Sequence, residues 1–187
     1  MGNKNTSPIV LVFAGPNGSG KTTITRRLKP AGTYINADDL KAEYALTDLE
    51  AAEMADSFRN ALLNNHRNFT FETVLSTNRN LHLLQKAKEQ GYKVHCIYVL
   101  TCDENINVAR VKSRYAAGGH DVPEDKIRKR YHRALDLIPE LIKICDNIII
   151  YDNSEIPTPI FEKTDADATI YPNNYWSEAD IIKLLED

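Results

Sequence analysis

The first long apolar run of the chain opens a stretch that decides the fold: residues 9–22 read IVLVFAGPNGSGKT. Its first six residues are apolar, and this predicts a buried strand. The next eight, at 15–22, match the pattern G-x-x-x-x-G-K-[ST] in full, and a helical pattern follows from Lys21. A strand, a glycine-rich turn and a helix in this order predict a loop that cradles phosphate groups.

The residue types of this loop suit a nucleoside triphosphate. Its glycines allow backbone conformations that turn N–H groups toward phosphate oxygens, and the helix N-terminus adds partial positive charge. The Lys21 ammonium would reach the β- and γ-phosphates, and the Thr22 hydroxyl would bind Mg²⁺. No guanine-specific N-K-x-D motif follows an internal strand, so ATP is favoured over GTP. The predicted nucleotide-binding residues are Gly15, Pro16, Asn17, Gly18, Ser19, Gly20, Lys21, Thr22 and Thr23.

Strand-like runs and helical patterns alternate along the rest of the chain, and this predicts an α/β fold with right-handed crossovers. The continuous apolar runs at 94–100 and 148–150 are typical of strands buried on both faces of a parallel sheet. The further strands are expected at 33–36, 69–72, 93–100 and 147–151, and the helices at 48–66, 80–90, 104–117 and 123–143.

The alternation of strand-like and helical patterns stops after Tyr151, where two prolines precede a possible hairpin at 160–163 and 169–171. A capping pair, Ser177 and Asp180, then predicts a final helix at 178–185. We expect one domain over residues 8–187, with a C-terminal appendage at about 154–187 and a flexible tail at 1–7.

The composition excludes several classes of protein. Of 187 residues 42% are hydrophobic, and the net charge is −3, which fits neither a generally basic nucleic-acid binder nor a highly charged disordered chain. Three cysteines without metal-binding spacing are expected to be reduced thiols. No apolar run approaches the roughly 20 residues that span a bilayer, and no signal peptide is recognised, so a cytoplasmic protein is expected.

Acidic residues follow two of the predicted strands. The second strand runs into Asp38 and Asp39, and the third ends at Glu72 and Thr73. Ligands of open parallel sheets bind beyond the carboxyl ends of the strands, so these carboxylates should lie near the γ-phosphate. Asp38 or Asp39 could accept a proton from an acceptor hydroxyl, while Glu72 could position substrate or a magnesium water. Asp38, Glu72 and Thr73 are the predicted substrate-binding residues. The alternative for the aspartates is a helix cap with a solvated neighbour.

Positive charge is concentrated in residues 110–133, which carry eight basic and three acidic residues and hence +5, against −8 for the rest of the chain. Two arginine-bearing helices joined by Gly118-Gly119 make a plausible lid over a triphosphate. Their guanidinium groups would stabilise charge on the transferring phosphoryl group, although a solvated basic face is the alternative. A nucleic-acid patch is disfavoured because aromatic residues are not interleaved at stacking spacing.

These motifs together resemble the zeta-toxin-like branch of small P-loop kinases over about residues 8–154. The motifs that carry the resemblance are GPNGSGKTT at 15–23, INADDL at 35–40, FETVLS at 71–76, AAGGHDVPEDKIRKRY at 116–131 and YDNS at 151–154. FET after the third strand and GGHxVP before the arginine helix are the specific ones. The chain lacks the long additional segments of the large plasmid-borne toxins, and its GGHxVP lid belongs to compact chromosomal relatives whose acceptors are largely undefined.

The resemblance implies a nucleotide-kinase-like parallel five-stranded sheet of order 2-3-1-4-5. Toxins of the family phosphorylate UDP-N-acetylglucosamine on a sugar hydroxyl and are inhibited by a small antitoxin. By position, Asp38 matches the family's general base and Glu72 its acid at the end of the third strand. Asn153, by analogy with related kinases, would sit near the adenine. The paired transition-state arginines would fall on Arg114 and Arg130, with Arg110, Arg128 and Arg133 close enough to be confused with them.

Three functions are therefore compatible with the sequence. The leading one is an ATP- and Mg²⁺-dependent kinase that acts on a hydroxyl of a small molecule, with UDP-N-acetylglucosamine as the favoured acceptor. The second is a kinase of another metabolite or of a polynucleotide end. The third is a nucleotide-binding regulatory protein with little turnover, for which an acceptor-facing acid such as Asp38 would not be required.

Overall fold

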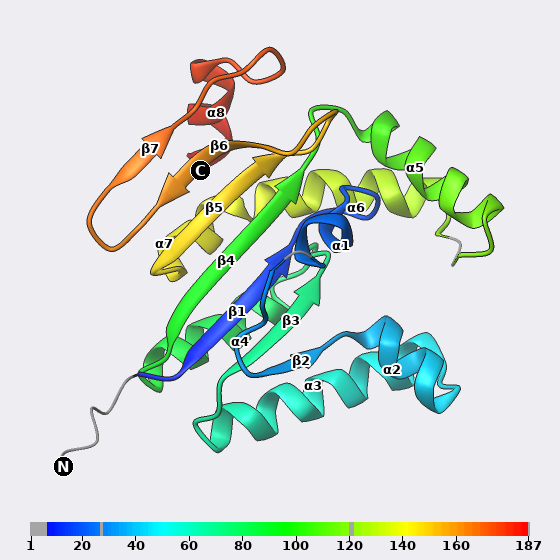
Figure 1. Ribbon diagram of the computed structural model, residues 1–187, viewed down its shortest axis with the longest axis vertical. Helices are drawn as coiled ribbons and strands as arrows, with labels where there is room; N and C mark the ends of the chain where they lie inside the picture. The colour runs from blue at the N-terminus through cyan, green and yellow to red at the C-terminus, as the bar shows by residue number, and fades with distance from the viewer. Residues whose placement is uncertain (1–6, 27, 120–121, 187) are drawn as a thin grey trace.

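The structure is a computed structural model that describes residues 7–26, 28–119 and 122–186. These residues form a seven-stranded sheet of order β2-β3-β1-β4-β5-β6-β7, flanked by helices (Figure 1). The strands are β1 (Ile9–Ala14), β2 (Thr33–Ile35), β3 (Phe69–Thr73), β4 (Lys93–Leu100), β5 (Asn147–Asp152), β6 (Thr158–Lys163) and β7 (Ala168–Ile170). The helices are α1 (Lys21–Thr25), α2 (Ala37–Tyr44), α3 (Asp48–Asn64), α4 (Arg79–Glu89), α5 (Glu104–Ala116), α6 (Glu124–Asp136), α7 (Ile138–Ile144) and α8 (Glu178–Leu185).

The first five strands are parallel and have the predicted order 2-3-1-4-5. β1 lies between β3 and β4, and its last residue, Ala14, pairs with Thr73 on one side and Tyr98 on the other. The glycine-rich loop therefore leaves the sheet at the middle of its carboxyl edge, where neighbouring strands deliver their own terminal residues.

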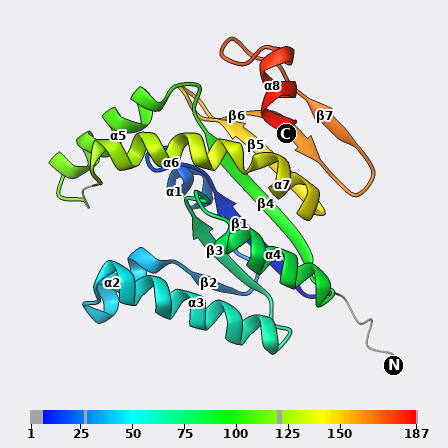
Figure 2. The same cartoon turned by 180° about the vertical axis from the view of Figure 1, so that it is seen from behind.

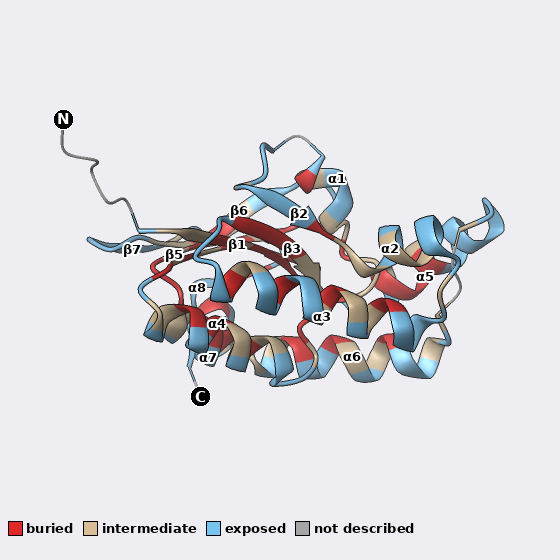
Figure 3. Cartoon of the chain, turned by 90° about the horizontal axis from the view of Figure 1, so that it is seen from below, coloured by how far each residue is buried: buried red, intermediate tan, exposed pale blue. Residues whose placement is uncertain are grey.

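The helices are distributed unequally over the two faces of the sheet. Figure 2 shows α3, α4, α6 and α7 on its near side, while α1 lies on the opposite face in Figure 3. The expectation that the apolar strands are buried on both faces was therefore wrong in part, because burial alternates along β4 and β5. Their helix-facing residues are buried, whereas Ile97 and Ile149 on the other face are partly exposed.

The C-terminal hairpin belongs to the sheet instead of standing apart from it. β6 pairs antiparallel with β5, with a register shift between Ile150 and Tyr151, and β7 pairs antiparallel with β6. The sheet thus has seven strands where five were expected. The final helix begins as predicted, because Ser177 and Asp180 form a complete capping box at the N-terminus of α8.

Three further expectations need correction or lie outside the described residues. The helix predicted over 123–143 is two helices, because the ring of Pro139 cannot continue α6 and instead sits in the first turn of α7. Residues 1–6 of the predicted tail, and His120 and Asp121 of the predicted lid, are not described. Within the described chain, no helix is both long and apolar enough to cross a membrane.

Candidate active site

The loop after β1 has the backbone that its glycines permit. Gly18 and Gly20 have φ angles of 77° and 89°, and Gly20 is the N-cap of α1. An added Cβ on Gly18 would lie 2.5 Å from the Asn107 carbonyl oxygen, and one on Gly20 would lie 2.2 Å from Asn153 Nδ2. Left-handed geometry and close packing both exclude larger residues here, so the loop is tightly seated against its neighbours.

Two buried asparagines hold the loop in place. Asn107 on α5 donates from Nδ2 to the Asn17 carbonyl at 2.6 Å, while its Oδ1 accepts from the Thr101 hydroxyl. Asn153, just after β5, donates from Nδ2 to the Ser19 carbonyl at 2.7 Å. Both side chains are buried, so these bonds are shielded from water. The cradle is therefore formed in the protein without a ligand.

The Lys21 ammonium folds back over this loop. Its Nζ donates to the carbonyl oxygens of Gly15 at 2.6 Å and Pro16 at 3.0 Å. Burial of the ammonium lowers the pKa of Lys21 to about 8. A cation held among loop carbonyls is poised to turn to a bound phosphate, since the anion offers a stronger charge-assisted partner.

Charged side chains from three other elements surround Lys21. After burial, the largest influences on its pKa are Glu72 and Asp38, which raise it, and Arg114, which lowers it. The structure thus brings together four residues that the sequence singled out, from α1, β3, α2 and α5. Two of the groups that act on Lys21 are acidic and one is basic.

Glu72 is held by two hydroxyl groups that sequence reasoning did not single out. Thr25 on α1 donates from Oγ1 to Glu72 Oε1 at 3.0 Å, and Tyr34 on β2 donates to the same oxygen at 2.7 Å. Burial, and next this hydrogen bond, raise the pKa of Tyr34 well above its ordinary value. The carboxylate is therefore fixed between the helix after the loop and the outermost strand. The Thr73 hydroxyl is instead engaged within the segment that follows β3. It accepts hydrogen bonds from Leu75 N at 3.0 Å and from Asn80 Nδ2 at 2.7 Å.

Asp38 and Asp39 lie in the first turn of α2 and not at a strand end, because β2 stops at Ile35. Asn36 is the cap of this helix, since its Oδ1 accepts from Asp38 N at 3.0 Å. The capping role weighed for the aspartates thus belongs to Asn36. Burial raises the pKa of Asp39, as do Glu72 and Asp38. Of the two aspartates, Asp38 is the one whose charge acts on Lys21.

The arginines at 110–133 fall into separate groups. Arg130 on α6 reaches the loop, with Nη1 3.4 Å from Asn17 Oδ1. Arg110 on α5 instead donates to the backbone carbonyls of Asn153 at 2.8 Å and Ser154 at 3.0 Å, which joins α5 to the end of β5. Arg130 thus contacts the loop and Arg114 acts on Lys21 through its charge, whereas Arg110 is engaged by backbone.

Of two other arginines, one is engaged by glutamates and one is exposed. Arg128 forms ion pairs with Glu104 and Glu124, each at 2.7 Å, and so joins α6 to α5. Arg133 is exposed on the last turn of α6. The two helices also pack through a small apolar cluster that includes Val108, Val111 and Ile127. This packing decides which arginines face the cradle.

The comparisons with known proteins identify the family of this chain. The family model of the zeta toxin matches residues 2–164, which is most of the chain. The chain belongs to the zeta toxin family. A protein of Haemophilus influenzae, described as uncharacterized, is 32% identical over 127 residues, which are 65% of this chain and 91% of the relative.

Solved structures share the fold of this zeta toxin family member. The chromosomal PezAT toxin–antitoxin system of Streptococcus pneumoniae matches with a TM-score of 0.61 at 20% identity, covering 99% of this chain and 80% of that one. The AvrRxo1-ORF1:-ORF2 complex with ATP matches with a TM-score of 0.76 at 16% identity, covering 97% of this chain and 64% of that one. The chain therefore spans less than two thirds of the second structure's chain. The fold is that of P-loop kinases.

Sequence reasoning on this family member missed the residues that support the site. Thr25 is four positions after Lys21, a spacing that places both on one side of a helix and could have drawn attention to it. Asn107 and Tyr34 gave no such signal, because their partners lie 90 and 38 residues away.

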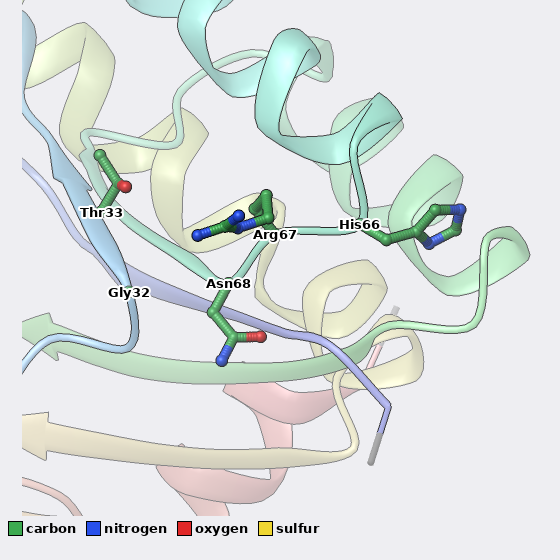
Figure 4. Close-up of a pocket in the computed structure, with 5 residues that line it drawn as sticks. All are labelled: Gly32, Thr33, His66, Arg67 and Asn68. Carbon is green, nitrogen blue, oxygen red and sulfur yellow. The ribbon is translucent and has the colours of Figure 1, made fainter. Parts of the chain in front are cut away.

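A small cavity of about 440 Å³ lies elsewhere on this family member, lined by Gly32, Thr33, His66, Arg67 and Asn68 (Figure 4). Thr33 opens β2 and Asn68 precedes β3, so the cavity is at the amino ends of these strands. The glycine-rich loop lies at the carboxyl ends. This cavity therefore takes no part in the phosphate site.

Proposed function

We propose that this protein is an ATP-dependent kinase that transfers the γ-phosphate to a hydroxyl of a small-molecule acceptor, with UDP-N-acetylglucosamine as the first candidate. The observation that carries the proposal is the set of charged groups that act on Lys21, namely the carboxylates of Glu72 and Asp38 and the guanidinium of Arg114. A protein that only binds a nucleotide needs the loop and its lysine, but not carboxylates close to that lysine. Transfer to a hydroxyl is accelerated by such a group, because it can accept the hydroxyl proton.

Each residue has a distinct role in the proposed reaction. Lys21 leaves the loop carbonyls and holds the β- and γ-phosphate oxygens. Asp38 accepts the proton of the attacking hydroxyl. Arg114 and Arg130 stabilise the charge on the transferring phosphoryl group. Glu72 orients the acceptor: its Oε1 takes the two hydroxyl hydrogen bonds, and we assign its Oε2 to the acceptor.

The donors beside the loop suit a magnesium ion that arrives with ATP. Mg²⁺ prefers oxygen ligands and is usually held by one or two protein groups together with substrate phosphates. Thr22 provides an exposed hydroxyl on the first turn of α1, and Glu72 provides a carboxylate nearby. Thr22 would hold the ion, which neutralises phosphate charge when it is bound.

The proposal is tested by incubating the full chain with ATP and Mg²⁺, with and without UDP-N-acetylglucosamine, and analysing the sugar nucleotide by mass spectrometry. We expect a gain of one phosphate group that depends on ATP. A metabolite extract serves as a second acceptor source. Phosphorylation of another metabolite in the extract would keep the kinase and replace the acceptor, whereas no ATP-dependent transfer from either source would overturn the kinase.

We also propose that a small antitoxin protein restrains this kinase. Support comes from the two solved structures, one of which is named as a toxin–antitoxin system. Co-purification of the full chain with the product of a neighbouring gene, followed by loss of ATP turnover in the complex, is the expected result. Unchanged turnover in a stable complex would contradict it.

A further inference from the structure

The last residue of β5, Asp152, carries a buried carboxylate to which the proposed reaction gives no role. Only 2% of this residue is exposed. Aspartate is rarely buried to this degree unless its charge is satisfied, because removing a carboxylate from water costs free energy. Asp152 accepts three hydrogen bonds, and they come from two different parts of the chain.

On one side, Asp152 fixes the turn that follows β5. Its Oδ1 accepts from Ser154 N at 3.0 Å and from the Ser154 hydroxyl at 2.5 Å. The same hydroxyl oxygen accepts from Cys102 N at 2.9 Å, and Asn153 N donates to the Leu100 carbonyl at 2.8 Å. The turn is therefore fastened to the end of β4 by backbone and side-chain bonds together.

Asn153 is the side chain that this turn delivers to the phosphate loop. Its Nδ2 donates to the Ser19 carbonyl at 2.7 Å, and a Cβ added to Gly20 would lie 2.2 Å from the same atom. Arg110 on α5 holds the turn from another direction by donating to the carbonyls of Asn153 and Ser154. Because the packing is this close, a displacement of Asn153 has to be shared by the loop.

On its other side, Asp152 receives the segment between β7 and α8, which is the orange-red loop at the top of Figure 1. Its Oδ2 accepts from Asn173 Nδ2 at 3.3 Å. Asn173 Oδ1 in turn accepts from Tyr175 N at 2.8 Å and Trp176 N at 2.9 Å, and Trp176 is buried in the main hydrophobic core. The Asn173 amide is thus presented to Asp152 by a compact turn that is anchored in the core.

We propose that Asp152 is a positioning residue of the nucleotide site, through which the C-terminal segment holds Asn153 on the phosphate loop. One carboxylate oxygen of Asp152 binds the turn that carries Asn153, and the other binds Asn173. The inference rests on the proposed function in one respect, that the loop binds ATP. A loop without this support would have to be ordered when ATP binds, which lowers the affinity for ATP.

An exchange of the two side chains tests the proposal. Asn173→Asp places a second carboxylate opposite Asp152, while its Oδ1 can still accept the two N–H groups of its own turn. Asp152→Asn keeps an oxygen for Ser154 but turns an N–H group toward the Asn173 donor. The double variant D152N/N173D again pairs a donor with an acceptor. Asn174→Asp makes the same chemical change at an exposed neighbour and is the matched control.

Two measurements on the full chain follow the consequence. Calorimetry gives the Kd for ATP with Mg²⁺, and amide hydrogen exchange of residues 15–20 without nucleotide reports how firmly the loop is held. Each single variant should raise the Kd about 2- to 30-fold, the range for coupling carried through side chains, and should speed exchange in the loop. The double variant should recover both values, and Asn174→Asp should change neither. In an active preparation, only the KM for ATP should rise.

The outcomes separate this inference from the kinase itself. Unchanged ATP affinity and loop exchange in both single variants would overturn the positioning role, even if thermal unfolding shows reduced stability. A double variant no better than the single ones would overturn the pairing of Asp152 with Asn173. Failure of the unaltered chain to bind ATP would overturn the proposed function. Faster loop exchange in the single variants, with recovery in the double variant, would still support the link between the C-terminal segment and the loop.

Discussion

The phosphate loop and the acid-bearing segment beside it differ in how firmly they are held. Asn107 and Asn153 fix the loop through buried hydrogen bonds, and its glycines touch neighbouring backbone and side chains. β2 by contrast has three residues, of which two are exposed, and every residue of α2 is at least partly exposed. The triphosphate is the same whichever acceptor is used, so a rigid loop suits it. The peripheral segment that carries the aspartates can instead vary with the acceptor.

Substitution of the cradle lysine should have the largest effect. We expect Lys21→Ala to bring turnover to background, because the ammonium is the mobile cation that meets the β- and γ-phosphates. Since the pKa of Lys21 is about 8, the ammonium form that binds phosphate predominates below that pH. ATP affinity should therefore fall as the pH rises through about 8, and Lys21→Arg should flatten this dependence. Calorimetric titration of ATP across pH checks both; affinity independent of pH in the unaltered chain would contradict the assignment.

On the acceptor side, Asp38→Asn should reduce transfer on the order of 10²–10⁴, the usual range for loss of a general base. Asparagine keeps the size and suits the first helical turn, so ATP affinity and folding should be near normal. Asp39→Asn is the comparator: it should act mainly on the KM for the acceptor. Steady-state kinetics of both variants test this assignment. A kcat that falls only in Asp39→Asn would assign the general base to Asp39 instead of Asp38.

The arginines of α6 sharpen the comparison on the phosphate side. Arg130→Ala should lower kcat on the order of 10²–10³ with a smaller effect on ATP binding, as expected for a donor that acts on the transition state. Arg133→Ala, three residues on along the same helix and exposed, is the matched control and should keep full activity. Equal activity of the two variants would mean that α6 presents only a solvated basic face.

The smallest effect is expected where the two regions meet. Tyr34→Phe removes one of the two hydroxyl groups that donate to Glu72 Oε1. The aromatic ring stays in place, and the Thr25 hydroxyl still donates. Loss of a single hydrogen bond to a partly buried carboxylate should change the KM for the acceptor by less than about tenfold. The KM for ATP should not move. If both KM values rise together, Tyr34 supports the fold and does not position Glu72.

The sequence was sufficient for the central part of the fold because that part is encoded locally. The apolar run of β1, the glycine pattern and the lysine stand next to one another, and the order of the five parallel strands follows from the family that the motifs resemble. The first turn of α2 was missed because Asn36, and not an aspartate, caps the helix. The residue pattern alone could not sort the arginines, since Arg128 and Arg130 differ in the partners that tertiary packing gives them: Glu104 on α5 for one and Asn17 of the loop for the other.

The C-terminal hairpin has a consequence for how the chain behaves at high concentration. β5 carries three consecutive isoleucines, Ile148–Ile150, and β6 occupies its outer hydrogen-bonding edge. A bare apolar strand edge is a template on which other chains can add their own strands. The hairpin thus protects the sheet against self-association by covering the edge of β5. A chain ending at Ser154 would keep the residues of the phosphate loop but expose an unpaired apolar strand edge that is prone to aggregation.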